Sequence, residues 1–168
     1  MCTQVIFDFV TPRNALLFAL FLILSSCGVV NEQRVPQQAT RTAAQESHVL
    51  DALNQAHNNW RGTPYVLGGA GMGGVDCSSF TQIVFKDYFG IELPRNTRQQ
   101  LQEGTSVRRN YTRPGDLVFF KTGRNMLHVG IIMKGDRFLH ASVSSGVMIS
   151  NIGQRYWATK YLGTRRIL

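Results

Sequence analysis

The sequence of 168 residues predicts an α+β fold in which helices come first and an antiparallel sheet follows. Between positions 47 and 90, apolar residues recur at helical spacing, which indicates two amphipathic helices. After Gly104 the pattern changes to short apolar runs separated by turn residues such as Gly135 and Asp136. Because helices and strands occupy separate parts of the chain, we expect N-terminal helices packed on a sheet of about five to six strands.

The two longer helices have recognisable ends. The first is expected from Ser47, a suitable N-cap residue, to about Trp60, and Gly62 stops it. Asp76 is a good N-cap for the second helix, and Gly90 is a good C-cap. On the first helix the apolar positions with helical spacing are Val49, Leu50, Leu53, Ala56 and Trp60.

The second half of the chain reads mainly as strands. Two short helices are also expected there, at about 97–103 and 154–161. Turn residues separate successive runs rich in β-branched and aromatic side chains. The expected strands are 116–121, 128–133, 138–142, 147–152 and 163–168.

The first 26 residues are predicted to be an export signal. Arg13 precedes an apolar run of about ten residues, and small residues lead to Cys27, a pattern typical of secretory signals and too short for an ordinary membrane span. The letters LSSC resemble the lipobox of bacterial lipoproteins, in which the cysteine is lipidated and becomes the first residue. Cys27 is therefore the expected lipidation site; the alternative is a plain signal peptide with a chance cysteine. Residues 27–46, polar and rich in Gln, Thr and Ala, are expected to form a flexible tether before a domain at 47–168.

The net charge of +8 suits an anionic partner, whether a polymer or a membrane surface. A basic surface that serves solubility alone is the alternative. Nucleic acid is a poor candidate, because the signal exports the chain and the basic residues form no recognised motif with aromatic ones.

Cys77 is the only cysteine after position 27. Asp76 places it in the first turn of a helix, where unpaired N–H groups and the helix dipole favour a thiolate. The glycine-rich letters GGAGMGG just upstream allow another chain to approach closely. These features indicate a nucleophile; a packing cysteine is the alternative.

His128 and His140 lie at the ends of adjacent predicted strands. A turn of two residues would put them on opposite faces of the hairpin. A turn of three, 134–136, pairs Gly130 with His140 and makes the histidines diagonal neighbours on one face, roughly 7–8 Å apart. We therefore predict an odd-length or bulged turn. Cys77, His128 and His140 also have the ligand types of a zinc site, but their wide separation fits no compact spacing motif, and no metal or cofactor is expected.

Six blocks carry a resemblance to a known family. They are GTPYVLGG, GVDCSSF, FGIELPRNTRQQ, RPGDLVFF, HVGIIM and FLHASVSSGVMIS, and they cover nearly all of the expected domain. In this order they resemble the NlpC-type cell-wall cysteine peptidases, and within that family the murein endopeptidase lipoproteins. The resemblance implies a papain-like core in which the cysteine helix packs on an antiparallel sheet that carries both histidines.

The resemblance also implies catalytic roles. Cys77 would be the nucleophile, His128 the general base, and His140 the polar third member that orients His128. Tyr65 would contribute its hydroxyl to the oxyanion site beside the Cys77 backbone N–H.

Four nearby residues have less definite roles. Asp76 and Ser78 match the family's flanks of the cysteine and are expected to be structural or to line the substrate site. Arg95 either lines the groove or braces a loop. Ser79 stands where many members of the family have glycine.

The implied function is hydrolysis of amide bonds in the stem peptides of peptidoglycan. Within the family, the D-alanyl–diaminopimelate cross-bridge is the favoured bond and the D-glutamyl–diaminopimelate bond within one stem is the alternative. Two other classes stay open, a non-catalytic wall-binding lipoprotein and a papain-like acyltransferase. Because Gly28 rather than aspartate follows Cys27, the expected place is the outer membrane of a Gram-negative cell, facing the periplasm, with a monomeric domain anchored through its lipid.

Overall fold

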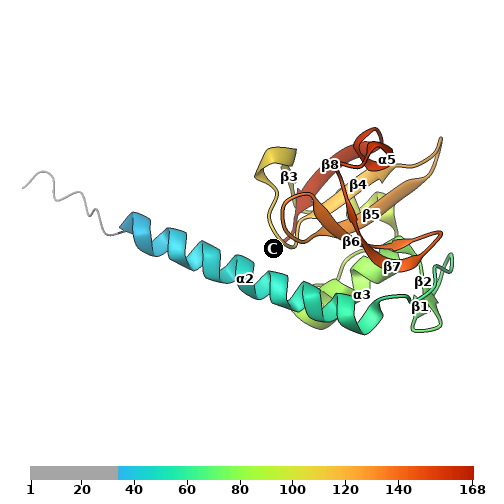
Figure 1. The fold of residues 1–168 in the computed structure, drawn as a ribbon, viewed down its shortest axis with the longest axis horizontal. Coiled ribbons are helices and arrows are strands. Elements are labelled where there is room, and N and C mark those ends of the chain that lie inside the picture. The colour runs from blue at the N-terminus through green and yellow to red at the C-terminus, as the bar shows by residue number, and fades with distance from the viewer. Residues whose placement is uncertain (1–33) are drawn as a thin grey trace, which may run out of the picture. The chain divides into compact units, whose positions relative to one another are not determined.

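A computed structural model describes the chain from Arg34 to Leu168, with side-chain burial from Thr42 onward. The predicted export signal, Cys27 and the first part of the predicted tether lie outside the described residues. One compact unit extends from Ala39 to Leu168, and it contains the sheet and the helices packed on it (Figure 1).

The first described helix, α2, is longer than the sequence predicts. It extends from Arg34 to Trp60, so Ser47 lies inside the helix and the prediction of an N-cap there is wrong. The expected tether is therefore helical from Arg34 onward. Gln, Ala and Arg in this segment all have high helix propensity, which lets a polar sequence continue a helix whose later turns are packed. Of the expected apolar stripe, Val49, Leu53 and Ala56 are buried in the core.

Helix α3 (Cys77–Phe89) begins and ends as predicted. The Asp76 carboxylate accepts a hydrogen bond from the Ser79 backbone N–H at 2.8 Å, and the Ser79 hydroxyl accepts one from the Asp76 N–H at 3.0 Å. This reciprocal capping box satisfies two backbone donors at the helix start. Gly90 ends the helix with φ of 68°, a left-handed conformation that glycine adopts without strain.

Six antiparallel strands form the main sheet in the order β3-β8-β4-β5-β6-β7. All five predicted strands are present, with ends shifted by at most two residues. The three-residue strand β3 and the small sheet of β1 and β2 are additions that the sequence does not predict. The bounds are β1 Ala70–Gly71, β2 Gly74–Val75, β3 Thr105–Val107, β4 Leu117–Lys121, β5 Leu127–Ile132, β6 Arg137–Ser142, β7 Gly146–Asn151 and β8 Tyr161–Arg166.

Three short helical segments complete the fold. Helix α4 (Thr97–Gln100) is shorter than predicted and is capped by the Asn96 side chain. A 3₁₀ turn, η1 (Arg109–Tyr111), precedes β4, and α5 (Arg155–Ala158) lies between β7 and β8.

The β5–β6 hairpin has the predicted three-residue turn. Ile131 pairs with Leu139 and Ile132 with Phe138, and the Met133 N–H donates to the Arg137 carbonyl at 2.9 Å, which leaves 134–136 as the loop. In this register Gly130 lies opposite His140. A Cβ at position 130 would be 2.6 Å from Phe138 Cδ2 and 3.1 Å from His140 Cβ, so only glycine leaves room for these two rings.

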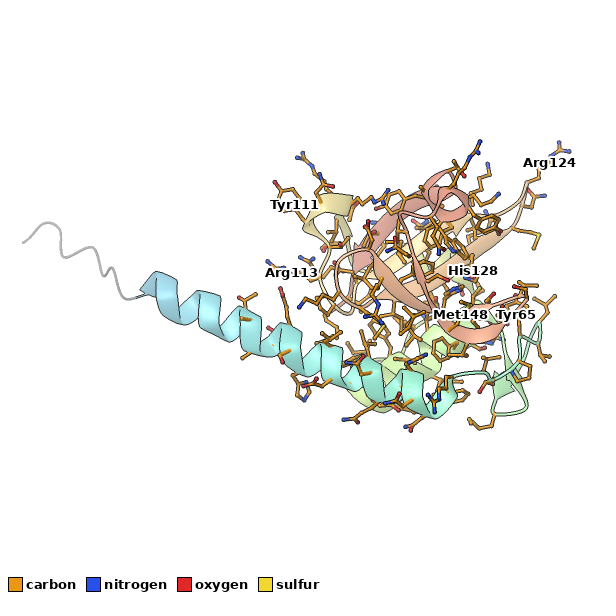
Figure 2. All side chains as sticks on the ribbon, in the orientation of Figure 1. Tyr65, Tyr111, Arg113, Arg124, His128 and Met148 are labelled. Atoms are coloured by element: carbon orange, nitrogen blue, oxygen red, sulfur yellow. The ribbon has the colours of Figure 1, made fainter. Side chains whose placement is uncertain are left out.

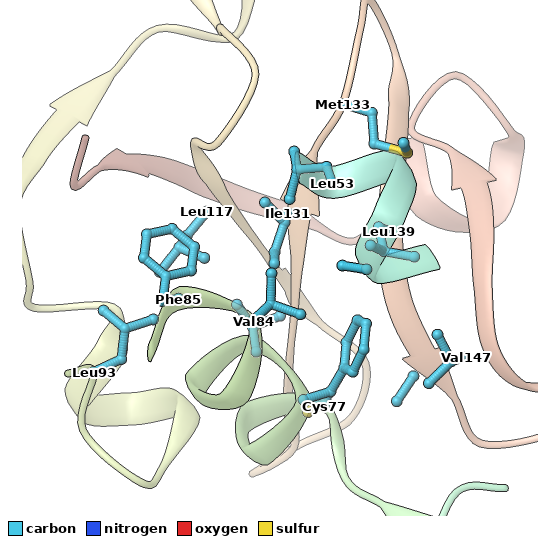
Figure 3. Packing of buried hydrophobic residues seen from close by; sticks show 14 of the residues in the cluster. Leu53, Cys77, Val84, Phe85, Leu93, Leu117, Ile131, Met133, Leu139 and Val147 are labelled. Atoms are coloured by element: carbon cyan, nitrogen blue, oxygen red, sulfur yellow. The ribbon is translucent and has the colours of Figure 1, made fainter. Parts of the chain in front are cut away.

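Both faces of the sheet are covered by apolar side chains. On one face, residues of β4, β5 and β6 pack against α2 and α3 around Leu53, Val84 and Phe85 (Figure 3). On the other face, Phe120 and Phe138 form a smaller cluster with Trp157 of α5. The histidine rings contact this second cluster, since both lie near Trp157.

The first prediction concerns Gly130. We expect Gly130→Ala to lower the free energy of unfolding by about 1–3 kcal/mol, because the added methyl group would overlap Phe138 and the Leu139 carbonyl. Thermal unfolding followed by circular dichroism should show a Tm lower by several degrees.

Gly163→Ala is the matched control, because Gly163 is also a strand glycine and a Cβ there would meet no atom within 4 Å. Its Tm should stay within about a degree of the wild type or rise slightly. Equal stability of the two variants would contradict the tight packing at Gly130.

Candidate active site

The thiol of Cys77 lies at the start of α3 and is 5% exposed. Its Sγ is 3.6 Å from Thr97 Oγ1, and the backbone N–H of Val129, at the start of β5, also interacts with the sulfur. Burial raises the pKa of the Cys77 thiol, and hydrogen bonds from Thr97 and the Val129 and Ser78 N–H groups only partly oppose this. The helix start therefore favours the thiolate less than the sequence suggests, and the resting group is a thiol.

His128 and His140 form a hydrogen-bonded pair. His128 Nε2 is 2.9 Å from His140 Nδ1, and both residues are buried (His128 is labelled in Figure 2). Burial lowers the pKa of His128 to about 4. Burial and the charge of His128 lower the pKa of His140 to about 3. Both rings are therefore neutral near pH 7.

This pairing determines which nitrogen of His128 is free. Nε2 is used by His140, so Nδ1 is the nitrogen that can exchange a proton with a thiol. Cys77 lies beside Val129, the residue that follows His128 on β5, which brings the thiol to the same end of this strand. The geometry is compatible with the predicted roles, in which Cys77 is the nucleophile, His128 the base and His140 the group that orients the base, and these roles stay predictions.

Tyr65 lies in the loop between α2 and β1 and pairs with Val75 in an isolated bridge. Burial raises the pKa of its hydroxyl, and negative charge on Cys77 or Asp76 raises it further. The phenol therefore stays protonated and can donate a hydrogen bond close to Cys77. Its contribution to an oxyanion site stays a prediction.

Asp76 links three segments of the chain around the start of α3. Arg95 donates to both carboxylate oxygens, at 2.7 and 3.0 Å, and Ser78 Oγ donates to one of them at 2.9 Å. The Gly68 N–H donates to the other at 3.0 Å. Burial alone would raise the pKa of Asp76, but the bonds from Arg95, the Ser79 N–H and Ser78 lower it to about 2.

These contacts indicate what the residues around Cys77 with less definite predicted roles do in the structure. Arg95 contacts Asp76, Ser78 Oγ and, at 3.5 Å, the Gly69 carbonyl, so it braces the glycine-rich loop against the helix start. Asp76 and Ser78 are buried and bonded to one another, which is a structural arrangement. The hydroxyl of Ser79 closes the capping box, which gives a physical reason for serine at this position.

Three residues near the site were not singled out by the sequence. Thr97 contacts the Cys77 sulfur, Ser150 Oγ is 2.9 Å from His140 Nε2, and the ring of Trp157 lies 5.2 Å from that of His128 and 5.1 Å from that of His140. Thr97 follows the letters LPRN inside the block FGIELPRNTRQQ, and this position is a weak signal of a role at the site. Ser150 could have been identified as a neighbour of His140 only if the β6–β7 register had been known, because the register decides which residues of adjacent strands lie side by side on one face.

A cavity of about 620 Å³ opens beside His128. His128, Ser150 and Trp157 line one part of it, and the serines of the β6–β7 turn line another. Its size and its mixed polar and apolar lining suit an extended peptide.

The described residues also bear on metal binding and on membrane insertion. Between Arg34 and Leu168, no three His, Cys, Asp or Glu side chains gather in a way that could hold a metal ion. Within the same part of the chain, none of the helices combines the length and apolar character that a membrane span requires.

Comparison with known proteins gives consistent matches. The model of the NlpC/P60 family matches residues 62–166. The murein DD-endopeptidase MepS/murein LD-carboxypeptidase of Escherichia coli (strain K12) is 38% identical over 167 residues, 89% of this chain and 89% of that protein. The probable endopeptidase NlpC of the same strain is 40% identical over 157 residues, 92% of this chain and 99% of that protein.

Solved structures show the same fold. An NLP/P60 family protein of Staphylococcus aureus, described as similar to lipoprotein, matches with a TM-score of 0.64 and 33% identity over 73% of this chain and 42% of that one. An NlpC/P60 family protein of Bacillus cereus matches with a TM-score of 0.63 and 29% identity over 70% of this chain and 39% of that one. This chain thus spans about two fifths of the length of these two structures.

The second prediction concerns Arg95. We expect Arg95→Ala to lower the free energy of unfolding at pH 7 by about 1–2 kcal/mol, because Asp76 loses a bidentate partner that is itself partly screened by solvent. The folded-state pKa of Asp76 lies below its ordinary value of 3.8, so this stabilisation is present above about pH 4 and is lost as pH falls towards about 2. Unfolding in urea at several pH values measures the difference.

Arg98→Ala is the matched control, since Arg98 is exposed on α4 and its substitution removes the same positive charge. It should cost less than about 0.5 kcal/mol at every pH. A difference between Arg95→Ala and the wild type that persists unchanged at pH 2 would contradict the pairing with ionised Asp76.

Proposed function

We propose that this chain, which belongs to the NlpC/P60 family, is a cysteine endopeptidase that hydrolyses amide bonds in the stem peptides of peptidoglycan. The observation that carries the proposal is the buried thiol of Cys77 beside the strand that holds a neutral His128, itself hydrogen-bonded to His140. Relatives named murein DD-endopeptidase and probable endopeptidase NlpC support it.

The chemistry follows from the protonation states. At rest Cys77 is a thiol and His128 is neutral, so the thiol proton moves to His128 Nδ1 as the sulfur attacks the carbonyl carbon. The carbonyl oxygen becomes an oxyanion, which the Tyr65 hydroxyl and the Cys77 N–H stabilise. The His128 imidazolium then gives its proton to the nitrogen of the leaving amine, and the C–N bond breaks to leave a thioester on Cys77.

A water molecule completes the cycle. Neutral His128 takes a proton from the water as its oxygen attacks the thioester carbon. Collapse of this second tetrahedral intermediate breaks the C–S bond and returns the proton to sulfur. The products are a free carboxylic acid and the original thiol, and every step uses residues of this chain.

The favoured bond is the D-alanyl–diaminopimelate cross-bridge between two stems. The relatives named DD-endopeptidase support this choice over the D-glutamyl–diaminopimelate bond within one stem. The cavity of about 620 Å³ lined by His128 has a volume that suits part of a peptide substrate.

We further propose that the chain is exported, lipidated on Cys27, and held as a monomeric domain on the periplasmic side of the outer membrane. The net charge of +8 supports contact with an anionic polymer.

The third prediction tests the chemistry and the bond together. Purified sacculi digested by the wild type should yield monomers with intact stems from cross-linked dimers, as measured by mass spectrometry of the muropeptides. Cys77→Ala should release none, because no other thiol occupies the site. Truncated stems would instead identify the bond within a stem, and full release by Cys77→Ala would refute the mechanism.

Two histidine substitutions, one in the site and one outside it, provide the matched control for this prediction. His128→Gln removes the base and should lower the rate of release by about 10²–10⁴-fold. His48→Gln makes the same change on an exposed turn of α2 and should leave the rate within about twofold of the wild type.

The fourth prediction tests the anchor. In a Gram-negative host, the wild-type chain should incorporate labelled palmitate and sediment with the outer membrane, whereas Cys27→Ala should do neither, since the thiol is the acylation site in the proposal. Labelling of Cys27→Ala to the wild-type level would rule out this anchor. The thiol-reactive labelling of Cys77 should be equal in the two proteins, which controls for folding.

A further inference from the structure

We propose that Ser150 is a positioning residue for the histidine pair: its hydroxyl accepts a hydrogen bond from His140 and so holds both rings in the tautomer that lets His128 take the proton of Cys77. This inference rests on the proposed function. It adds a fourth member, on the edge strand β7, to the line formed by Cys77, His128 and His140.

The register of β6 and β7 places Ser150 beside His140. His140 pairs with Met148 and Phe138 pairs with Ser150, so Ser150 is the diagonal neighbour of His140 on the same face of the sheet. The Oγ–Nε2 distance is 2.9 Å, equal to the Nε2–Nδ1 distance between the two histidines. Two hydrogen bonds of good length therefore connect Ser150 to His128 through the His140 ring.

The ring protons of His128 and His140 can be placed in two ways, which differ in the direction of donation along the line of hydrogen bonds. In the productive direction, His128 Nε2–H donates to His140 Nδ1, His140 Nε2–H donates to Ser150 Oγ, and His128 Nδ1 is free to accept a proton. In the reverse direction, His140 Nδ1–H donates to His128 Nε2, and the proton of His128 must then be on Nδ1. A ring protonated at Nδ1 cannot act as the base for Cys77.

The Ser150 hydroxyl can accept from His140 Nε2–H in the productive direction or donate to His140 Nε2 in the reverse one, so its effect on the balance follows from what its absence would leave unpaired. Without an acceptor, the productive direction has a buried N–H with no partner, which carries the full desolvation cost of that group. The reverse direction would leave only a ring lone pair without a donor, which is tolerated better. When His128 gains the thiol proton, its charge also strengthens each donated bond along the line, and Ser150 is the last acceptor.

The surroundings offer His140 Nε2 no substitute for Ser150. The Phe138 ring stacks on that of His140 with centroids 4.7 Å apart, the Trp157 ring lies edge-on beside both with its centroid 5.1 Å from each, and Met148 lies opposite on β7. None of these side chains has a charge or an acceptor comparable to a hydroxyl, and His128 is the titratable group that faces His140. Within the described residues, Ser150 Oγ is the hydrogen-bond partner shown for His140 Nε2.

The test compares two variants of the same shape. Ser150→Thr keeps the hydroxyl and Ser150→Val replaces it with a methyl group, and both β-branched residues suit a strand. With purified cross-linked muropeptides, we expect kcat of Ser150→Thr within about threefold of the wild type. We expect kcat of Ser150→Val to fall about tenfold or more, as the loss of a buried hydrogen bond predicts, with KM within about twofold. Equal kcat for the two variants would overturn the proposal, and so would a loss confined to KM.

A third variant tests the pH dependence of kcat/KM, which a merely structural role of Ser150 would leave unchanged. Ser150→Asp provides a carboxylate that only accepts, so it enforces the productive direction and stabilises protonated rings. The acid limb of kcat/KM should therefore shift to higher pH than in the wild type. An acid limb that stays in place would count against the proposal. Ser106→Val, on the opposite edge strand β3, is the control and should leave kcat and the pH profile unchanged.

A measurement that needs no activity separates this inference from the proposed function. Long-range ¹H–¹⁵N spectra of the histidine rings, recorded on full chains with Cys77→Ala, report which nitrogen of each ring carries the proton. Protonated Nε2 on both rings, and its loss in Ser150→Val, would support the positioning role even if the wild type released no muropeptides. An active wild type in which Ser150→Val leaves both tautomers unchanged would refute the role and leave the proposed function intact.

Discussion

The register of the β5–β6 hairpin is the constraint on which the rest of the site depends. Side chains alternate between faces along a strand, so a turn shorter by one residue would point His140 away from His128. The three-residue turn brings their nitrogens to 2.9 Å, and Gly130 between them leaves room for the His140 and Phe138 rings. A second register, that of β6 and β7, places Ser150 as the residue of β7 diagonal to His140.

Burial then determines the resting chemistry. The cysteine helix covers one face of the sheet and Trp157 the other, and the removal of water makes every charged form in the site costly. This raises the pKa of the Cys77 thiol and lowers the pKa of both histidines, so the catalytic groups are neutral until a substrate carbonyl is present. In the proposed mechanism, charge therefore appears only as the proton moves, and Tyr65 and the histidine pair are the groups proposed to stabilise it.

Sequence reasoning succeeded where a local rule decides the outcome. The cap at Asp76 and the stop at Gly90 follow from neighbouring residues, and both are confirmed. The odd-length turn was predicted because His128 and His140 need to share a face of the hairpin, and it is confirmed as well. It failed where partners far along the chain decide. Strand β3 is short and largely exposed and exists because it pairs with β8, and Thr97 and Ser150 reach the site only through tertiary contacts. The prediction of an N-cap at Ser47 failed because serine is also tolerated inside a helix when the residues around it have high helix propensity.

Asp76 holds together the glycine-rich segment around Cys77. Its two carboxylate oxygens accept from Ser79, Ser78, Gly68 and Arg95, so the helix start, the glycine-rich loop and the segment before α4 share one anion. An ionised carboxylate has about four acceptor positions, and here five donors from these four residues share them, so none is left over. The glycines can therefore provide close approach for a substrate chain while the position of Cys77 is held by charge-assisted hydrogen bonds rather than by the loop itself.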